Sequence, residues 1–281
     1  MQEGKFSRTA QRVAIRRAAH QLLDQPRVLD DPLALRIIGV EAAQALRSSP
    51  REGHGFARAF RAFMAARSRY AEDQLARAVG NGVTQYVVLG AGLDTFGCRN
   101  PHSELRVLEV DHPVTQAWKR EQLKAAGIAV PSSLTFVPVD FEQQTPADGL
   151  RQSGFSENEP AFFSWLGVTP YLTHVAFLTT LSFIAKMPAG SGVVFDFTVD
   201  RKLLNFGQKM ALDALSRRVA AAGEPFQLFF DPGRLQEELK GLGFRRTALL
   251  QGEEINALYF KDRTDGLCIR GGLGHLMSAW L

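Results

Sequence analysis

A glycine-rich turn and two acidic positions carry the clearest chemical signal in this 281-residue sequence. The turn, Gly90-Ala91-Gly92, directly follows an apolar run, and glycines there let the backbone approach a nucleotide-like ligand closely. Asp111 lies nineteen residues beyond the last of these glycines, at the end of the next apolar run, where a carboxylate can accept hydrogen bonds from a ribose diol. Asp140 and Phe141 follow a third run, where they could contact an adenine amino group and ring.

Other nucleotide-binding motifs fit this turn less well. A dinucleotide fingerprint needs a third glycine in the pattern G-x-G-x-x-G, and that position is Thr95 here. The chain has no G-x-x-x-x-G-K-[ST] segment, the pattern of a phosphate-binding P-loop. Each acidic residue has an alternative as the cap of the next helix, and Glu109 shares the strand face of Asp111 and can support it. Together, the features at three successive strand ends favour a nucleoside-containing ligand.

Short apolar runs alternate with helix-length spacers through the middle of the chain and predict the elements that hold these residues. The spacers 114–126 and 174–187 have helix lengths, and Thr173 can cap the second. This alternation predicts βαβ units and a doubly wound, mostly parallel α/β sheet, in which ligands bind beyond the carboxyl ends of the strands. The runs predicted as strands are 86–89, 105–110, 134–139, 161–166 and 192–197.

Residues 1–80 are predicted to form an N-terminal helical cap packed on this core. Apolar residues recur at helical spacing over 9–23, and Asp31-Pro32 is typical of the start of a second helix. A third, longer helix is expected over 55–79. The core then comprises 81–281, and the whole chain forms one structural domain.

The last third of the chain is predicted to add a lid and the far edge of the sheet. The amphipathic stretch 201–222 is too long for a crossover turn and is interpreted as an inserted lid helix. Asp231-Pro232 opens one more helix. Strands are expected near 244–250 and 256–260, with the turn 261–266 as a hairpin connection.

Composition excludes several classes of protein. With 45% hydrophobic and 22% charged residues, the chain is typical of a globular protein. Two cysteines, Cys98 and Cys268, are too few for a disulfide framework or a multi-cysteine zinc site, and no metal is predicted. The first twenty residues lack the apolar segment of a secretory signal, and no run of 18 apolar residues occurs. We therefore expect a cytoplasmic protein without a membrane partner.

Positive charge is concentrated at the front of the chain. The formal net charge is +4, and residues 1–70 alone carry thirteen Lys and Arg against six Asp and Glu. Such a segment could meet an anionic ligand, a membrane surface or a nucleic acid. Arginines spaced through apolar helical sequence are, however, typical of a solvated helix face, and the fourth strand lacks the Asn/Asp-Pro-Pro-Tyr motif of base-modifying enzymes. No nucleic-acid partner is expected.

The run 85–95 (QYVVLGAGLDT), with EVDHP at 109–113 and VDF at 139–141, resembles the leucine carboxyl methyltransferase family of class I S-adenosylmethionine-dependent enzymes, and looks closest to its bacterial O-methyltransferase branch. This resemblance covers nearly the whole chain. It implies a Rossmann-like, mostly parallel seven-stranded sheet with an N-terminal helical extension. Further similar segments are Arg17-Ala18, Asp31-Pro32-Leu33-Ala34, Arg67-Ser68-Arg69, Ser164-Trp165, Gly167-Val168-Thr169, Tyr171-Leu172 and Tyr259-Phe260.

The resemblance also implies roles for single residues. Arg67, with Arg69 as the alternative, would pair with the methionine carboxylate of S-adenosylmethionine, a contact suited to a guanidinium. The turn Gly90-Ala91-Gly92 would lie under the cofactor, and Asp111 would hold its ribose hydroxyls. Adenine would contact the residues at 140–141.

One position departs from the family pattern. Family members often carry a glutamate in the fourth-strand segment just before a Gly-Val pair, and this chain has Leu166 there. The substitution removes a carboxylate expected near the amino group or sulfonium of the cofactor, although a neighbouring carbonyl could replace it. A catalytically weak or inactive cofactor-binding protein of the same fold is therefore the main alternative.

The resemblance predicts an O-methyltransferase acting on a carboxyl or hydroxyl group of a small molecule. A carboxylate attacking the sulfonium methyl needs only positioning and exclusion of water, whereas a hydroxyl also needs a base. Tyr171 and His174 are the candidate acceptor-site residues, and His112 is a further histidine near a strand end. A packed core tyrosine and surface histidines are the alternatives, and no catalytic residue is assigned.

Apolar strips on the cap and on the lid could close a hydrophobic acceptor pocket, or could simply pack in the core. The less favoured enzyme class is an NAD-dependent oxidoreductase. The protein is expected to be a monomer or a homodimer.

Overall fold

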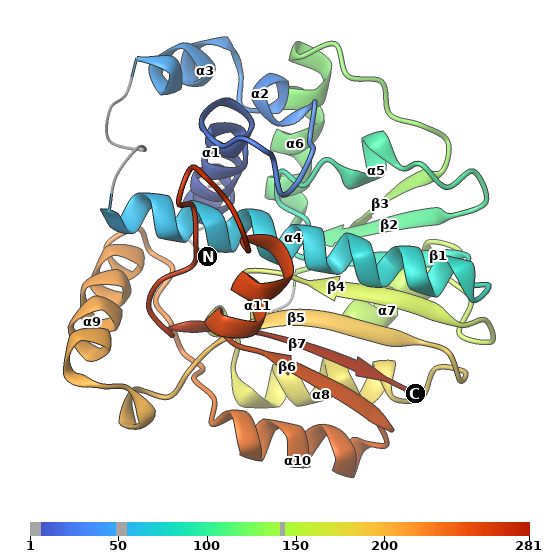
Figure 1. Cartoon of the computed structure of the whole chain (residues 1–281). Helices are drawn as coiled ribbons and strands as arrows, with labels where there is room; N and C mark the ends of the chain where they lie inside the picture. The colour runs from blue at the N-terminus through green and yellow to red at the C-terminus, as the bar shows by residue number, and fades with distance from the viewer. Residues whose placement is uncertain (1–6, 49–54, 141–143) are drawn as a thin grey trace.

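The computed structural model describes residues 7–48, 55–140 and 144–281, and its centre is one seven-stranded sheet (Figure 1). The strand order is β3-β2-β1-β4-β5-β7-β6. Every neighbouring pair is parallel except the two that β7 makes with β5 and β6. This arrangement confirms the predicted doubly wound, mostly parallel α/β sheet. The strands are β1 (Gln85–Leu89), β2 (Arg106–Asp111), β3 (Leu134–Pro138), β4 (Ala161–Trp165), β5 (Gly192–Thr198), β6 (Arg246–Leu250) and β7 (Gly274–Trp280).

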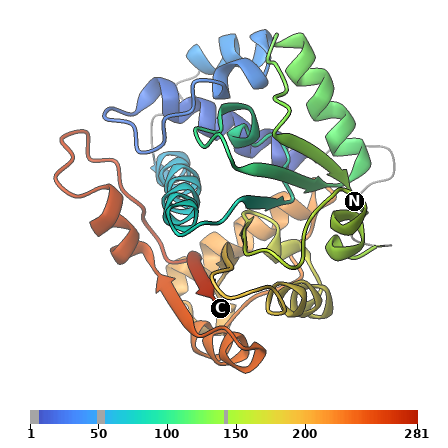
Figure 2. The ribbon, with the colours of Figure 1, turned by 90° about the vertical axis from the view of Figure 1, so that its right-hand side faces the viewer.

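Helices cover both faces of the sheet. One face packs against α4 and α11, and the opposite face against α7, α8 and α10 (Figure 2). The helices are α1 (Arg8–Leu23), α2 (Ala34–Ile37), α3 (Val40–Arg47), α4 (Gly55–Gly80), α5 (Phe96–Arg99), α6 (Pro113–Ala125), α7 (Pro146–Gln152), α8 (His174–Ile184), α9 (Phe206–Ala220), α10 (Pro232–Leu242) and α11 (Gly252–Tyr259), with short 3-10 turns at Thr169–Tyr171 and Arg201–Leu203.

The apolar runs of the sequence become the central strands because both of their faces are covered. Every residue of β1, β4 and β5 is buried, as expected for parallel strands between two layers of helices. On one face, for example, the ring of Trp165 stacks on Phe177 of α8 with centroids 5.4 Å apart. On the other face, Phe162 stacks on Trp280 of β7 at 5.4 Å.

Strand order also defines where a ligand can enter. After β1 the chain continues to β2 on one side, and β4 later pairs with the other side of β1. The connections on the two sides of β1 run in opposite directions across the sheet, which opens a crevice at the carboxyl ends of β1 and β4. The glycine turn at 90–92 directly follows β1 and therefore lies at this crevice.

Helices are present in the predicted N-terminal segment and in the predicted insertion, but the insertion is not one continuous helix. The long helix α4 ends at Gly80 and contacts β4 and β5. The stretch 201–222 forms a 3-10 turn followed by α9, which lies near the start of α4 at the end of the sheet opposite the C-terminus (Figure 1).

The C-terminal prediction is correct for one strand and wrong for the other. The strand expected near 244–250 is β6, but 256–260 lies in α11 and the residue after it. A capping box between Gln251 and Glu254 starts this helix, and its buried Ile255 packs on the sheet. The turn at 261–266 follows α11 rather than joining two strands, and the seventh strand is the later β7.

Candidate functional site

The glycine turn after β1 needs glycine at its first and third positions. Gly90 and Gly92 have φ values of 69° and 50°, which L side chains rarely adopt. A Cβ on Gly90 would lie 2.3 Å from Cγ2 of Val168, so the turn also passes very close to the segment after β4. The amide of Gly90 donates to the carbonyl of Val110 at 2.8 Å, which ties the turn to β2.

The carboxylate of Asp111 faces this turn from the end of β2. Its two oxygens accept hydrogen bonds from the backbone amides of Gly92 at 2.5 Å and His112 at 2.7 Å. Burial raises the pKa of Asp111 above its ordinary value, although these two amides oppose the shift. Glu109, on the same strand face, pairs instead with Lys119 at 2.5 Å in a fully buried ion pair, which excludes it from direct contact with a ligand.

The third strand end contributes Asp140. One of its oxygens lies 3.9 Å from Nε2 of His112, so the residues that follow β2 and β3 meet at this edge of the sheet. Phe141, the predicted partner of an adenine ring, lies outside the described residues.

These strand ends open into a cavity of about 290 Å³, here called the glycine-turn cavity. Its volume is close to the lower end of the range for small-ligand pockets. It is also bordered by α1, α4 and the segments that follow β4 and α9, including Leu166 and Glu224. The predicted residues that line it are Arg67, Gly90, Ala91, Gly92, Asp111, Asp140 and Tyr171, together with His112, the further histidine near a strand end.

A second cavity of about 850 Å³ lies beside the first and is here called the arginine cavity. Its apolar wall comes from α4, α9 and the segment before β7. Six arginines line it, namely Arg12, Arg16, Arg58, Arg67, Arg218 and Arg270. The residues common to both cavities are Thr9, Val13, Arg67, Gly167 and Tyr171, which therefore form the wall where the two spaces meet.

Arg67 of α4 is held in this shared wall by Asp196 of β5. Its Nη1 donates to Asp196 Oδ2 at 2.6 Å, while the amide of Gly167 donates to Oδ1 at 2.5 Å. A Cβ on Gly167 would lie 2.8 Å from Nη2 of Arg67, so the glycine makes room for the guanidinium. The Nε of Arg67 is buried with no hydrogen-bond partner among the described residues.

Tyr171 lies in the same wall, and burial raises the pKa of its hydroxyl to about 12. The hydroxyl therefore keeps its proton at neutral pH and can donate a hydrogen bond. His174 lies elsewhere: it starts α8, is half exposed, and its Nε2 is 3.4 Å from Glu238. His174 is not among the described residues that line either cavity, so we do not retain it as an acceptor-site residue. Arg69 likewise pairs with Asp73 on an exposed surface.

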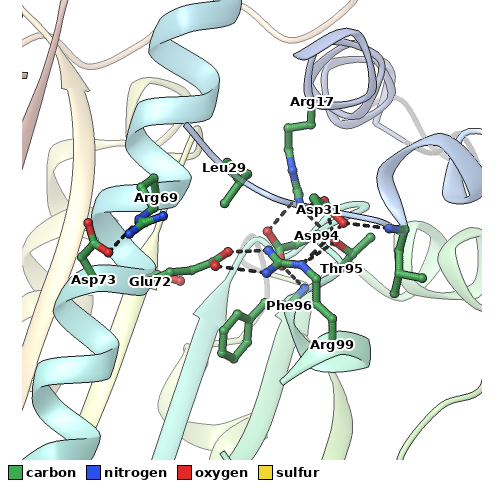
Figure 3. A network of polar contacts seen from close by, with 12 residues as sticks. Arg17, Leu29, Asp31, Arg69, Glu72, Asp73, Asp94, Thr95, Phe96 and Arg99 are labelled. Atoms are coloured by element: carbon green, nitrogen blue, oxygen red, sulfur yellow. Dashed lines mark hydrogen bonds and ion pairs between the residues drawn. The ribbon is translucent and has the colours of Figure 1, made fainter. Parts of the chain in front are cut away.

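A buried network of charges connects α1 to the glycine turn (Figure 3). Arg17 donates to Asp31 at 2.5 Å, to Asp94 at 2.9 Å and to the hydroxyl of Thr95 at 3.0 Å. Arg99 extends the network through a paired contact with Glu72 of α4. Although burial opposes ionisation of Asp94, the arginines lower its pKa. The network fixes the turn against α1 and α4.

Sequence reasoning did not assign three residues that the structure brings to the site. Asp196 could have been noticed as the one carboxylate in the otherwise apolar strand GVVFDF. Arg17 lies in the Arg17-Ala18 segment that resembles the family, but its helical spacing alone does not separate it from its neighbouring arginines. Glu224 lies in a Gly-Glu-Pro turn after α9, far from every strand end in the sequence, and its Oε2 is buried without a partner among the described residues.

Fold and site together define the class of protein. A seven-stranded sheet with β7 reversed, a glycine turn after β1 and acidic residues after β2 and β3 match a nucleoside-binding methyltransferase of class I. Two solved structures share the fold: a DUF574 family protein of Streptomyces avermitilis (TM-score 0.56, 16% identity, covering 94% of this chain and 99% of that one) and a "putative methyltransferase" of Thermobifida fusca (TM-score 0.57, 16% identity, 99% and 96%).

Sequence comparison identifies the family. The sequence pattern of the leucine carboxyl methyltransferase family matches residues 10–185, more than half of the chain. The chain is 32% identical to a Bacillus subtilis protein named "Putative S-adenosyl-L-methionine-dependent methyltransferase YktD", with 95% of each chain covered. It is 34% identical to a Mycobacteroides abscessus protein of the same description, over 60% of this chain and 56% of that one.

The chain therefore belongs to the leucine carboxyl methyltransferase family. It is an S-adenosylmethionine-dependent methyltransferase, and S-adenosylmethionine is its cofactor. Across residues 7–48, 55–140 and 144–281, no helix is long and apolar enough to cross a membrane. The same residues contain no group of three or more His, Cys, Asp or Glu side chains placed to hold a metal ion.

Proposed function

We propose that this protein transfers a methyl group to a carboxyl oxygen of a small molecule, with the cofactor in the glycine-turn cavity and the acceptor in the arginine cavity. The charge of the second cavity carries this proposal. Asp196 is the one acidic residue among the described residues that line it, against six arginines, and it is already paired with Arg67. Such a surface attracts an anionic acceptor and disfavours a cationic one.

The residues of the glycine-turn cavity fit S-adenosylmethionine. Gly90 and Gly92 adopt positive φ values and carry no side chain, so the backbone of the turn, with Ala91 between them, would lie bare beneath the ligand. The carboxylate of Asp111, already oriented by two amides, would accept from the ribose hydroxyls. Asp140 lies at the next strand end, where it would accept a hydrogen bond from the adenine amino group. We keep the expectation that Phe141 contacts the adenine ring.

Two buried polar atoms without partners fit the amino-acid end of the cofactor. Arg67 Nε is a donor for a carboxylate, and Glu224 Oε2 is an acceptor for an ammonium group. Both residues line the glycine-turn cavity. Leu166 also lines it, so Glu224 would supply the negative charge that this position lacks in the present chain. The charges of the amino-acid end would then be satisfied from α4 and from the turn after α9.

S-adenosylmethionine supplies a methyl group on a positively charged sulfur. The chain's own residues would bring the acceptor oxygen to the wall shared by the two cavities, hold it in line and exclude water. Tyr171 in that wall is a protonated donor at neutral pH, so it can orient an acceptor carboxylate but cannot serve as a base. No histidine is found among the described residues that line the arginine cavity. A carboxylate, which needs no base, is therefore the acceptor that this lining supports best.

Calorimetric titration of S-adenosylmethionine into wild-type protein and Asp111→Ala tests the cofactor site. We expect the variant to bind tenfold to about 100-fold more weakly, because hydrogen bonds to a charged acceptor are lost. Asp148→Ala, which removes an exposed carboxylate of α7, is the matched control and should bind as wild type does. Equal affinity of Asp111→Ala and wild type would disprove the assigned ribose site.

Transfer of a labelled methyl group to a panel of aliphatic and aromatic carboxylic acids then tests the reaction. Base-stable label in the acid fraction would contradict a carboxyl acceptor, because carboxyl methyl esters are cleaved by mild base. Cofactor binding without transfer to any acid or alcohol would favour an inactive cofactor-binding protein.

A further inference from the structure

The six arginines of the arginine cavity fall into two groups. Three have contacts inside the protein: Arg67 pairs with Asp196, Arg58 donates to the carbonyl of Asp265, and Arg16 lies 4.8 Å above the ring of Phe60. The other three, Arg12, Arg218 and Arg270, are exposed and form no ion pair with any residue that the structure describes. They are called here the unpaired arginines.

The unpaired arginines come from three separate parts of the chain. Arg12 lies on α1, Arg218 on the last turn of α9, and Arg270 in the segment between α11 and β7. Folding thus brings three like charges to the lining of one cavity, where they attract anions. An anionic group bound there would accept charge-assisted hydrogen bonds from them.

The interior of the same cavity is apolar. Its wall includes aromatic and aliphatic side chains of α4, β5, α9 and the turn that follows α9. The reacting end of an acceptor must lie at the wall shared with the glycine-turn cavity, which holds Arg67 and Tyr171. The apolar side chains that line the rest of the space include Phe60, Phe63, Met64, Phe197, Leu215 and Phe226.

We infer that the acceptor is an elongated amphipathic acid with an anionic group at each end. One carboxylate lies at the shared wall and receives the methyl group, the apolar body fills the cavity, and the second anionic group is bound by the unpaired arginines. This inference rests on the proposed function and adds the substrate class. It requires an oxygen of the first carboxylate to form the new C–O bond as the methyl–sulfur bond breaks, which leaves a neutral ester and a neutral thioether.

The inference is tested by calorimetric titration of acids into protein saturated with S-adenosylhomocysteine. The probes are the straight-chain dicarboxylates sebacate, dodecanedioate and tetradecanedioate, each compared with the ω-hydroxy acid of the same length. We expect at least one dicarboxylate to bind wild-type protein about tenfold more tightly than its hydroxy acid. The two molecules differ at the far end, which is a charged carboxylate in the dicarboxylate and an uncharged hydroxyl in the hydroxy acid. The double variant Arg218→Gln/Arg270→Gln should lose this preference while retaining affinity for the hydroxy acid.

Arg217→Gln is the matched control, since Arg217 neighbours Arg218 on α9, is also exposed and is not among the described residues that line the cavity. It should keep the full preference. Circular dichroism and S-adenosylhomocysteine affinity verify that each variant is folded. Equal affinities in wild type, no binding of any dicarboxylate, or an unchanged preference in the double variant would each overturn the inference. Failure of the proposed function is distinguishable, because it would show as loss of cofactor binding or of methyl transfer to every acid.

Discussion

Arginines near the two cavities belong to two regions with opposite chemistry. In the buried region, Arg17 and Arg61 each contact carboxylates that are almost fully buried, at 2.5 Å to Asp31 and 2.8 Å to Asp24. At the rim of the arginine cavity, Arg12 and Arg218 are exposed and have no ion pair among the described residues. The buried arginines are neutralised by carboxylates within the fold, and these ion pairs hold helices to loops. The exposed arginines leave their charge available to a ligand.

The sharpest way to test this difference uses two positions of α1. Arg17→Met should lower the free energy of unfolding by about 3–5 kcal/mol, because it leaves the buried Asp31 and the partly buried Asp94 without their main cation. Arg12→Met, on the same helix, should change it by no more than about 0.5 kcal/mol. Urea unfolding followed by circular dichroism measures both values. Similar losses in the two variants would remove the distinction between the two regions.

Acid pH tests the buried region by a second route. Burial opposes the charge of Asp24, yet hydrogen bonds from Arg61 and His20 lower its pKa to about 2. A carboxyl group with a lowered pKa in the folded state stabilises the protein above its unfolded pKa, and this stability disappears as the pH falls. We expect Asp24 to account for about 2 kcal/mol of the stability lost between about pH 4 and pH 2.

The control for this effect is Asp24→Asn, measured by urea unfolding at each pH. The variant is less stable at neutral pH, but its unfolding free energy should change less steeply over the same interval. A slope equal to that of wild type would show that Asp24 is not the group responsible.

Much of the fold and of the glycine-turn cavity could be predicted from the sequence because the signals are local. Apolar runs of strand length, a glycine turn and a carboxylate at a strand end lie within a few residues of one another. The topology of parallel strands then brings Asp111 and Asp140 to one edge of the sheet, where the structure places both in the wall of one cavity. The strand misplaced at 256–260 shows the limit of short apolar patterns, which helices and strands share.

Pairing between distant segments could not be predicted in this way. By helical pattern alone, Arg12 and Arg17 look alike, since both are basic residues in an amphipathic helix. They differ because Asp94, 77 residues beyond Arg17, folds against one and not the other. The sequence places His174 near a predicted strand end, but its side chain contacts Glu238 of α10 on the surface. Contacts of this kind depend on tertiary packing rather than on spacing.

In the glycine-turn cavity, the pKa of Asp111 is shifted in the direction opposite to that of Asp24, so its effect should begin at a higher pH. Burial raises the pKa of Asp111, so this carboxylate takes up a proton at a higher pH than an ordinary aspartate. A protonated Asp111 loses part of its capacity to accept from the ribose hydroxyls. We therefore expect S-adenosylhomocysteine affinity to weaken as the pH falls, by up to about tenfold per pH unit below the pKa of Asp111. Calorimetry from neutral to mildly acidic pH measures it, and Asp111→Asn should bind weakly without this pH dependence.

Salt concentration should affect the buried and the exposed arginines differently, and this is the smallest of the expected effects. Exposed charges are screened when the Debye length shortens from about 10 Å at 0.1 M salt to about 3 Å at 1 M, whereas buried pairs are screened much less. Dicarboxylate affinity should therefore fall a few fold over this range, while the unfolding free energy that Arg17 contributes, measured against Arg17→Met, stays constant. The ω-hydroxy acids serve as controls, since they lack the end that contacts the unpaired arginines. A dicarboxylate affinity independent of salt would mean that the unpaired arginines do not bind its second carboxylate. The difference between the two groups of arginines would then rest only on their effects on the unfolding free energy.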